Sequence, residues 1–204
     1  MGQGLPRGPL SKRTVHLCVD MQRMFRDETA WHTPWMERVT PMVAAITAEH
    51  PAATIFTRFI PPQRAEDMEG GWRTFYERWG EFTRERIDPA LLELVEPLGD
   101  FAPPARILDK PGFSPFHRTD LAAWLRQAAI DTVVVTGAET DMCVLAAVLD
   151  AIDFGLRVVI PTDALCSSSD AMHDALLQLY SGRFSMQIET ADTETVLANW
   201  ARRA

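Results

Sequence analysis

The sequence predicts a single α/β domain in which a parallel sheet of six strands carries helices on both faces. Three observations support this fold class. Short apolar runs of strand length alternate with longer segments of helical periodicity about six times along the chain. The apolar runs contain few polar positions, which is typical of strands buried on both faces of a sheet. The 204 residues, 47% of them hydrophobic, are enough for one sizeable core.

The predicted strands are short runs rich in β-branched or aromatic residues that end at Pro, Gly or charged positions. They cover residues 14–19, 53–59, 106–109, 132–136, 157–160 and 185–189. Together they would give a three-layer α/β/α arrangement, with ligands bound at the carboxyl ends of the strands.

The helices between these strands are predicted from capping residues. Thr40 and Pro41 are expected to be the N-cap and first-turn proline of a helix that Pro51 stops. Asp88 is expected to cap a helix that reaches about Leu98. The remaining predicted helices cover residues 120–129, 143–154, 169–180 and 192–200.

Residues 1–13 are rich in Gly, Pro and basic side chains, so we expect a flexible leader followed by one domain of residues 14–204. The leader lacks the apolar core of a signal peptide, and no later run approaches the ~20 apolar residues that span a bilayer. Three cysteines in a chain of this length do not form a disulfide framework. We therefore expect a cytoplasmic protein.

The charge pattern bears on the kind of partner. The formal net charge is −8 and the basic residues are scattered, which argues against nucleic acid or an anionic membrane as the main partner. A small molecule is the expected ligand. The irregular segment of residues 63–86 holds several aromatic residues and either docks on the core or forms a lid or pocket wall.

Three reactive side chains follow predicted strands, and each would lie at the carboxyl end of the sheet. Asp20 comes after the first strand, Lys110 after the third and Cys143 after the fourth. A cysteine nucleophile needs a base to take its proton and benefits from a nearby cation. Asp20 is the candidate base and Lys110 the candidate cation. A helix cap, a surface lysine and a small packing cysteine are the structural alternatives.

Cys143 also begins a predicted helix. Unpaired N–H groups and the positive end of the helix dipole favour a thiolate at such a position. The sequence therefore favours a reactive cysteine there, whereas Cys18 and Cys166 are assigned to structural roles.

With these residues in place, the chain resembles the isochorismatase-like cysteine hydrolase superfamily, which includes nicotinamidases, carbamoyl-amide hydrolases and isochorismatases. Three strings carry the resemblance, in order and with appropriate spacing, and it extends from about residue 14 to residue 200. They are VDMQRMF at 19–25, DKPGFSPF at 109–116 and TGAETDMCV at 136–144.

The resemblance implies a catalytic triad of Asp20, Lys110 and Cys143 on a Rossmann-like sheet ordered 3-2-1-4-5-6. It implies a cis peptide bond between Ala138 and Glu139, with the N–H groups of Glu139 and Cys143 forming an oxyanion hole. It also implies hydrolysis of an amide or carbamoyl carbon–nitrogen bond through a thioester. Members of the superfamily commonly form oligomers, so a homodimer or homotetramer is expected.

One departure concerns the metal that nicotinamidases bind through histidines after the second strand. No histidine occurs between His50 and His117, and the acidic side chains in that stretch would make a poor zinc site. We therefore expect neither a catalytic metal nor another cofactor.

The substrate-binding residues are expected among side chains that neighbour the triad in the three strings and in the aromatic segment. They are Gln22, Phe25, Trp72, Phe113, Phe116 and Met142, with Glu139 beside them. These residues indicate a small, partly apolar amide.

Other functions stay open at this point. One is an isochorismatase-type hydrolase of a non-amide substrate, and another is a non-catalytic binding or scaffold member of the same fold. Phosphoryl chemistry of the haloacid-dehalogenase type is disfavoured, because Gln22 stands where that reaction needs a second carboxylate.

Overall fold

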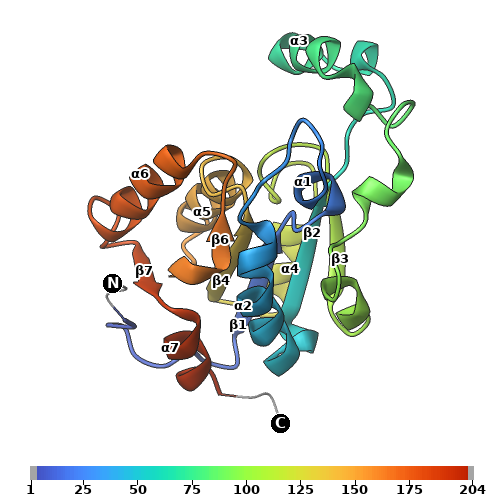
Figure 1. Ribbon diagram of the computed structural model, residues 1–204. Helices are drawn as coiled ribbons and strands as arrows, with labels where there is room; N and C mark the ends of the chain where they lie inside the picture. The colour runs from blue at the N-terminus through green and yellow to red at the C-terminus, as the bar shows by residue number, and fades with distance from the viewer. Residues whose placement is uncertain (1–3, 202–204) are drawn as a thin grey trace.

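The computed structural model describes residues 4–201, and it contains one parallel sheet of seven strands. The strand order is β3-β2-β1-β4-β5-β7, and the two-residue strand β6 pairs with β4 (Figure 1). The predicted fold class and strand order are confirmed, with β7 in the sixth place and β6 as an unpredicted addition. The strands are β1 (Thr14–Val19), β2 (Thr54–Phe59), β3 (Arg106–Lys110), β4 (Thr132–Ala138), β5 (Arg157–Pro161), β6 (Leu165–Cys166) and β7 (Ile188–Ala191).

Helices cover both faces of this sheet, as Figure 1 shows. The apolar core on one face packs against α4, α5 and α6, and the core on the other face packs against α1, α2 and α7. The helices are α1 (Arg23–Arg26), α2 (Met36–Glu49), α3 (Gly70–Arg78), α4 (Leu121–Gln127), α5 (Cys143–Asp153), α6 (Asp170–Ser181) and α7 (Thr193–Ala198). None of these helices is long and apolar enough to cross a membrane.

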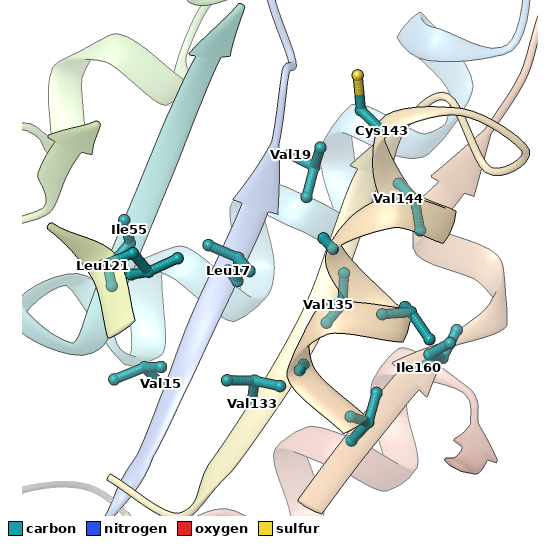
Figure 2. Packing of buried hydrophobic residues seen from close by; sticks show 14 of the residues in the cluster. Val15, Leu17, Val19, Ile55, Leu121, Val133, Val135, Cys143, Val144 and Ile160 are labelled. Atoms are coloured by element: carbon teal, nitrogen blue, oxygen red, sulfur yellow. The ribbon is translucent and has the colours of Figure 1, made fainter. Parts of the chain in front are cut away.

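Alternate residues of the central strands point to opposite faces, which divides the core between the two helical layers. Val133 and Val135 of β4 lie in the cluster that includes α5, whereas Val134 lies in the cluster that includes α7. Figure 2 shows this packing, with Cys143 at the first turn of α5 and near Val19 at the end of β1. The packing of the buried side chains of α5 against the sheet therefore fixes the position of Cys143 at the start of this helix.

The helix predicted from Asp88 does not form. Asp88 caps the segment as expected, with Oδ1 accepting from Ala90 N at 2.9 Å, but only the 3₁₀ turn η4 (Pro89–Leu92) follows. The next carbonyls bond to the chain after β1 instead: Leu92 O accepts from Gln22 Nε2 at 2.8 Å. These tertiary bonds replace the helical ladder.

Helix α2 begins earlier than the sequence indicated. Its first residue is Met36, so Thr40 and Pro41 lie inside the helix rather than at its start. Met36 and Val39 are buried against the core. Pro41 has no N–H and therefore removes one backbone hydrogen bond on the exposed side of the helix. The burial of Met36 and Val39 compensates for the stability lost with that bond.

Residues 1–3 of the expected leader lie outside the described residues, and residues 4–13 pack on the domain rather than fraying. Leu10 is 2% exposed and its N–H donates to Asn199 O at 2.8 Å. Arg7 forms an ion pair with the buried Glu189 of β7. This stretch therefore belongs to the folded body.

Candidate active site

Asp20, Lys110 and Cys143 meet at the carboxyl ends of the central strands. The Lys110 ammonium lies 2.7 Å from Asp20 Oδ2 and donates to Cys143 Sγ at 3.4 Å and to Gly112 O at 2.8 Å. To reach them from β3, Lys110 crosses the end of β2, where its Nζ lies 5.2 Å from the centre of the Phe59 ring. Asp20 and Lys110 are 1% exposed and Cys143 is 7% exposed. The three side chains form one buried cluster.

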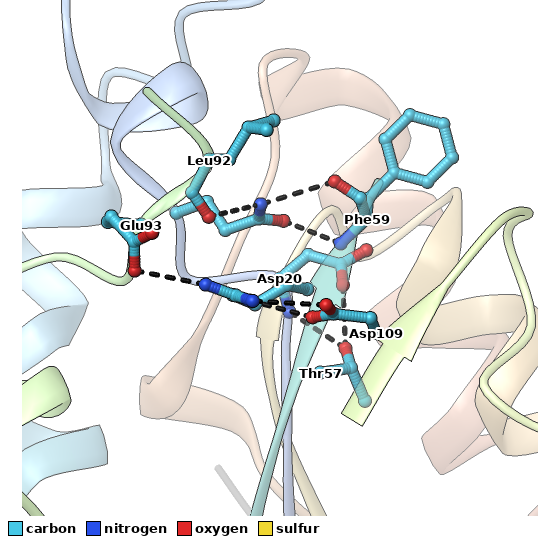
Figure 3. Close-up of polar contacts among 8 residues, drawn as sticks. Asp20, Thr57, Phe59, Leu92, Glu93 and Asp109 are labelled. Carbon is cyan, nitrogen blue, oxygen red and sulfur yellow. Dashed lines mark hydrogen bonds and ion pairs between the residues drawn. The ribbon is translucent and has the colours of Figure 1, made fainter. Parts of the chain in front are cut away.

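The carboxylate of Asp20 is held from the neighbouring strand. Thr57 Oγ1 on β2 donates to Asp20 Oδ1 at 2.6 Å, and the N–H of Asp20 donates to the same hydroxyl at 3.1 Å (Figure 3). Asp20 has a φ of +49°, in the left-handed region that Asp tolerates better than most residues. The side chain is therefore fixed by its backbone and by Thr57 together.

The thiol of Cys143 is neutral at rest. Burial raises its pKa, and the charge of Asp20 raises it further, while the charge of Lys110 only partly opposes these effects. Burial alone would lower the pKa of Lys110, but the attraction of Asp20 and Cys143 leaves that pKa above its ordinary value. From the sequence we expect the helix N-terminus to favour a thiolate at Cys143. The effect of burial, which raises the pKa of the thiol, is larger.

The end of β4 needs a glycine. Gly137 has a φ of +104° and pairs with Val19 of β1. A Cβ on Gly137 would lie 2.1 Å from Val19 O, a distance that no side chain tolerates. The peptide bond that follows, between Ala138 and Glu139, is cis.

The same loop is anchored to the unpredicted strand β6 and to helix α6. The N–H of Thr140 donates to Cys166 O at 2.9 Å, and the hydroxyl of Thr140 lies 2.8 Å from His173 Nδ1. These contacts fix the turn that leads into Cys143.

A cavity of about 220 Å³ opens onto Cys143. Its lining comes from the segment after β1, the end of β2, helix α3 and the loops before α4 and α5. The lining residues are Phe25, Trp31, Phe59, Phe75, Trp79, Phe113, Glu139, Met142 and Cys143.

Three of the six predicted substrate-binding residues do not line this cavity. The amide of Gln22 is fully buried and bonds the backbones of Phe59 and Leu92. Trp72 stands behind the wall, with its ring centre 4.8 Å from that of Phe113. The ring of Phe116 is partly buried and packs against the core cluster and on Phe154, with the ring centres 5.0 Å apart. Phe25, Phe113 and Met142 do line the cavity, as does Glu139.

Four lining residues were not singled out as binding residues from the sequence: Trp31, Phe59, Phe75 and Trp79. The sequence signal for Trp31, Phe75 and Trp79 was the unusual density of aromatic residues on irregular segments, whereas Phe59 was predicted only as the last residue of a strand. Phe75 and Trp79 line the cavity, so residues 63–86 supply part of the pocket wall, whereas a lid stays a prediction.

The same segment offers no metal site. Within residues 4–201, no group of three or more His, Cys, Asp or Glu side chains is arranged to hold a metal ion. Asp67 instead caps a 3₁₀ turn by accepting from Arg64 N at 3.0 Å. The side chains present therefore do not fit the metal of the nicotinamidases.

The isochorismatase domain matches residues 14–192. The chain belongs to the isochorismatase family. Among relatives in this family, the uncharacterized isochorismatase family protein YwoC of Bacillus subtilis is 28% identical over 133 residues, which are 65% of this chain and 64% of that protein. The chain spans 60 to 64% of the length of the first curated relatives it matches.

Other members of the isochorismatase family match over more of their length. Nicotinamidase 3 of Arabidopsis thaliana is 26% identical over 90% of this chain and 88% of its own. The crystal structure of the pyrazinamidase of Pyrococcus horikoshii in complex with zinc shares 26% identity, with a TM-score of 0.71 over 88% of this chain and 99% of that chain.

Proposed function

We propose that this isochorismatase-family protein hydrolyses the carbon–nitrogen bond of a small amide, with Cys143 as the nucleophile. The observation that carries the proposal is the contact of Cys143 with the buried Lys110 and Asp20 pair at the wall of a cavity. The similarity to a nicotinamidase and to a pyrazinamidase supports an amide as the substrate.

The first step is proton transfer coupled to attack. Because the thiol is neutral at rest, a base must take its proton as Sγ bonds to the amide carbon. Asp20 interacts with that thiol, and Thr57 holds the carboxylate in place. Lys110 keeps a positive charge between the two groups, which compensates the negative charge as it moves from Asp20 to sulfur and then to the substrate oxygen.

The negative oxygen of the tetrahedral intermediate needs hydrogen-bond donors. Across residues 4–201, the backbone N–H groups of Glu139 and Cys143 donate to no other backbone group. Both N–H groups flank the turn into α5, and they are the proposed donors to the substrate oxygen. Removing one donor of this kind typically costs about 3 kcal/mol of transition-state stabilisation.

The intermediate then collapses, and the carbon–nitrogen bond breaks. Asp20 returns its proton to the departing nitrogen, so that ammonia or an amine leaves and the acyl group remains on Cys143 as a thioester. Water attacks the thioester while Asp20 takes a proton from it, and the thiol is regenerated as the acid departs. The sum is amide plus water to acid plus ammonia or amine.

The proposal is tested by ammonia release from a panel of primary amides with the wild type and Cys143→Ala. We expect release that survives EDTA and disappears in Cys143→Ala. Cys166→Ala is the matched control, because that buried cysteine lies outside the cavity around Cys143. Activity of Cys143→Ala close to that of the wild type would rule out the thioester route. A homodimer or homotetramer and a cytoplasmic location stay predictions.

A further inference from the structure

The wall of the cavity around Cys143 is mostly apolar. Six of its nine lining residues are aromatic and a seventh is Met142, which leaves Glu139 as its one charged member among the described residues. A volume of about 220 Å³ is below the roughly 300 to 1,000 Å³ of pockets for drug-sized ligands. The space fits one ring or a branched chain of similar size.

The carboxylate of Glu139 is already occupied. Its Oε2 accepts from the Ser168 N–H at 2.8 Å, from the Ser168 hydroxyl at 2.5 Å and from the Ser167 hydroxyl at 3.3 Å. An ionised carboxylate only accepts hydrogen bonds and repels another anion. Glu139 therefore offers nothing to a negatively charged substrate.

The nearby cations are also committed elsewhere. The Lys110 side chain is 0% exposed and is used by Asp20, Cys143 and Gly112 O. Arg58 pairs with Asp109 and Glu93 on the outer side of β2 and β3. Of residues 4–201, none of the arginines or lysines lines the cavity.

The aromatic wall is tied together by ring contacts. Trp31 stacks on Phe82 with ring centres 3.6 Å apart and planes at 4°, and its centre lies 5.6 Å from that of Phe75. Trp72 backs Phe113 at 4.8 Å. A wall braced from behind keeps its shape, so it does not readily rearrange to bring a distant cation inward.

From this wall we infer that the acyl group of the substrate is apolar, and that amides carrying a carboxylate are rejected. The inference rests on the proposed amide hydrolysis. A carboxylate placed in this cavity would lose its hydration without gaining a cation, which disfavours its binding strongly. A hydrocarbon group of the same shape gains from leaving water.

Two amides with similar shape but different charge test the inference. They are 4-methylpentanamide and succinamate, in which a carboxylate replaces the isopropyl group. We expect kcat/KM to favour 4-methylpentanamide by at least about 100-fold. Equal or greater kcat/KM for succinamate would overturn the inference.

A binding measurement separates this inference from the proposed function. Equilibrium binding of the same two amides to Cys143→Ala, followed by ligand-observed NMR, does not require turnover. If 4-methylpentanamide binds and is not hydrolysed by the wild type, amide hydrolysis fails while the cavity preference stands. If succinamate binds as tightly as 4-methylpentanamide, the preference fails whatever the wild type hydrolyses.

A charge placed in the wall provides the matched variant. In Phe75→Arg, the guanidinium should raise the ratio of kcat/KM for succinamate to that for 4-methylpentanamide by at least tenfold. Phe154→Arg is the control, because Phe154 is 52% exposed and lies outside the cavity. The ratio does not depend on the folded fraction of either variant. An unchanged ratio in Phe75→Arg would contradict the role assigned to the wall.

Discussion

Thr57 Oγ1 donates to Asp20 Oδ1 at 2.6 Å, so a neutral hydroxyl on β2 fixes the carboxylate that would act as the base. Hydrogen bonds to charged groups are worth about 1.5 to 3 kcal/mol. In Thr57→Val, which keeps the shape and removes the hydroxyl, we expect kcat to fall by about 10- to 100-fold with little change in KM. Thr57→Ser should recover most of the loss. Steady-state kinetics that show a changed KM with normal kcat would refute this positioning role.

The ion pair between Lys110 and Asp20 makes a prediction about stability. Lys110→Met leaves the Asp20 carboxylate buried without its cation, which typically costs about 3 to 5 kcal/mol. Adding Asp20→Asn removes the orphaned charge, so the double variant should be more stable than Lys110→Met while staying inactive. Urea unfolding measures both. A Lys110→Met protein as stable as the wild type would show that the pair is not buried in solution.

Gly137 is predicted to be irreplaceable. Gly137→Ala places a Cβ 2.1 Å from the Val19 carbonyl oxygen at a φ of +104°, so it should fail to fold or unfold at a much lower temperature. Gly99→Ala is the control, since nothing lies within 4 Å of its added Cβ. The control should change the free energy of unfolding by less than about 1 kcal/mol. Similar melting temperatures for the two variants would contradict the register of β1 and β4.

The rate of alkylation reports the protonation state of Cys143. Because burial and Asp20 hold the pKa of this thiol above its ordinary value, its thiolate fraction should rise about tenfold per pH unit between pH 7 and 9. We expect the iodoacetamide rate to follow this rise without a plateau, and Cys143→Ser to abolish it. The more deeply buried Cys18 and Cys166 should react more slowly. A plateau below pH 8 would reveal a resting thiolate.

His16 predicts a dependence of stability on pH. Burial first, and the charge of His50 second, lower the pKa of His16 from 6.5 to about 3, so between these values only the unfolded chain takes up this proton. Stability should therefore fall as the pH drops below 6.5, by at most about 1.4 kcal/mol per pH unit from this group. In His16→Gln, the free energy of unfolding should fall less steeply between pH 6.5 and 5. Equal slopes would contradict a neutral buried His16.

The sequence by itself determined the fold, because the alternation of apolar runs with capped helices depends on local periodicity. β1 begins and ends where the run 14–19 predicted, and the strand ends carry Asp20, Lys110 and Cys143. Once parallel strands are assumed, their carboxyl ends must meet at one edge, so the three side chains could be grouped without coordinates. The family followed from the strings around them.

Only the tertiary structure decided which aromatic residues face Cys143. Phe113 and Phe116 share one loop, yet the first lines the cavity and the second packs, partly buried, against the core cluster that includes α5. The helix predicted after Asp88 was wrong since Leu92 and its neighbours bond to the chain after β1. The protonation state of Cys143 depends on burial, which no local pattern encodes. Long-range contacts fix these features, whereas short-range periodicity fixes the strands.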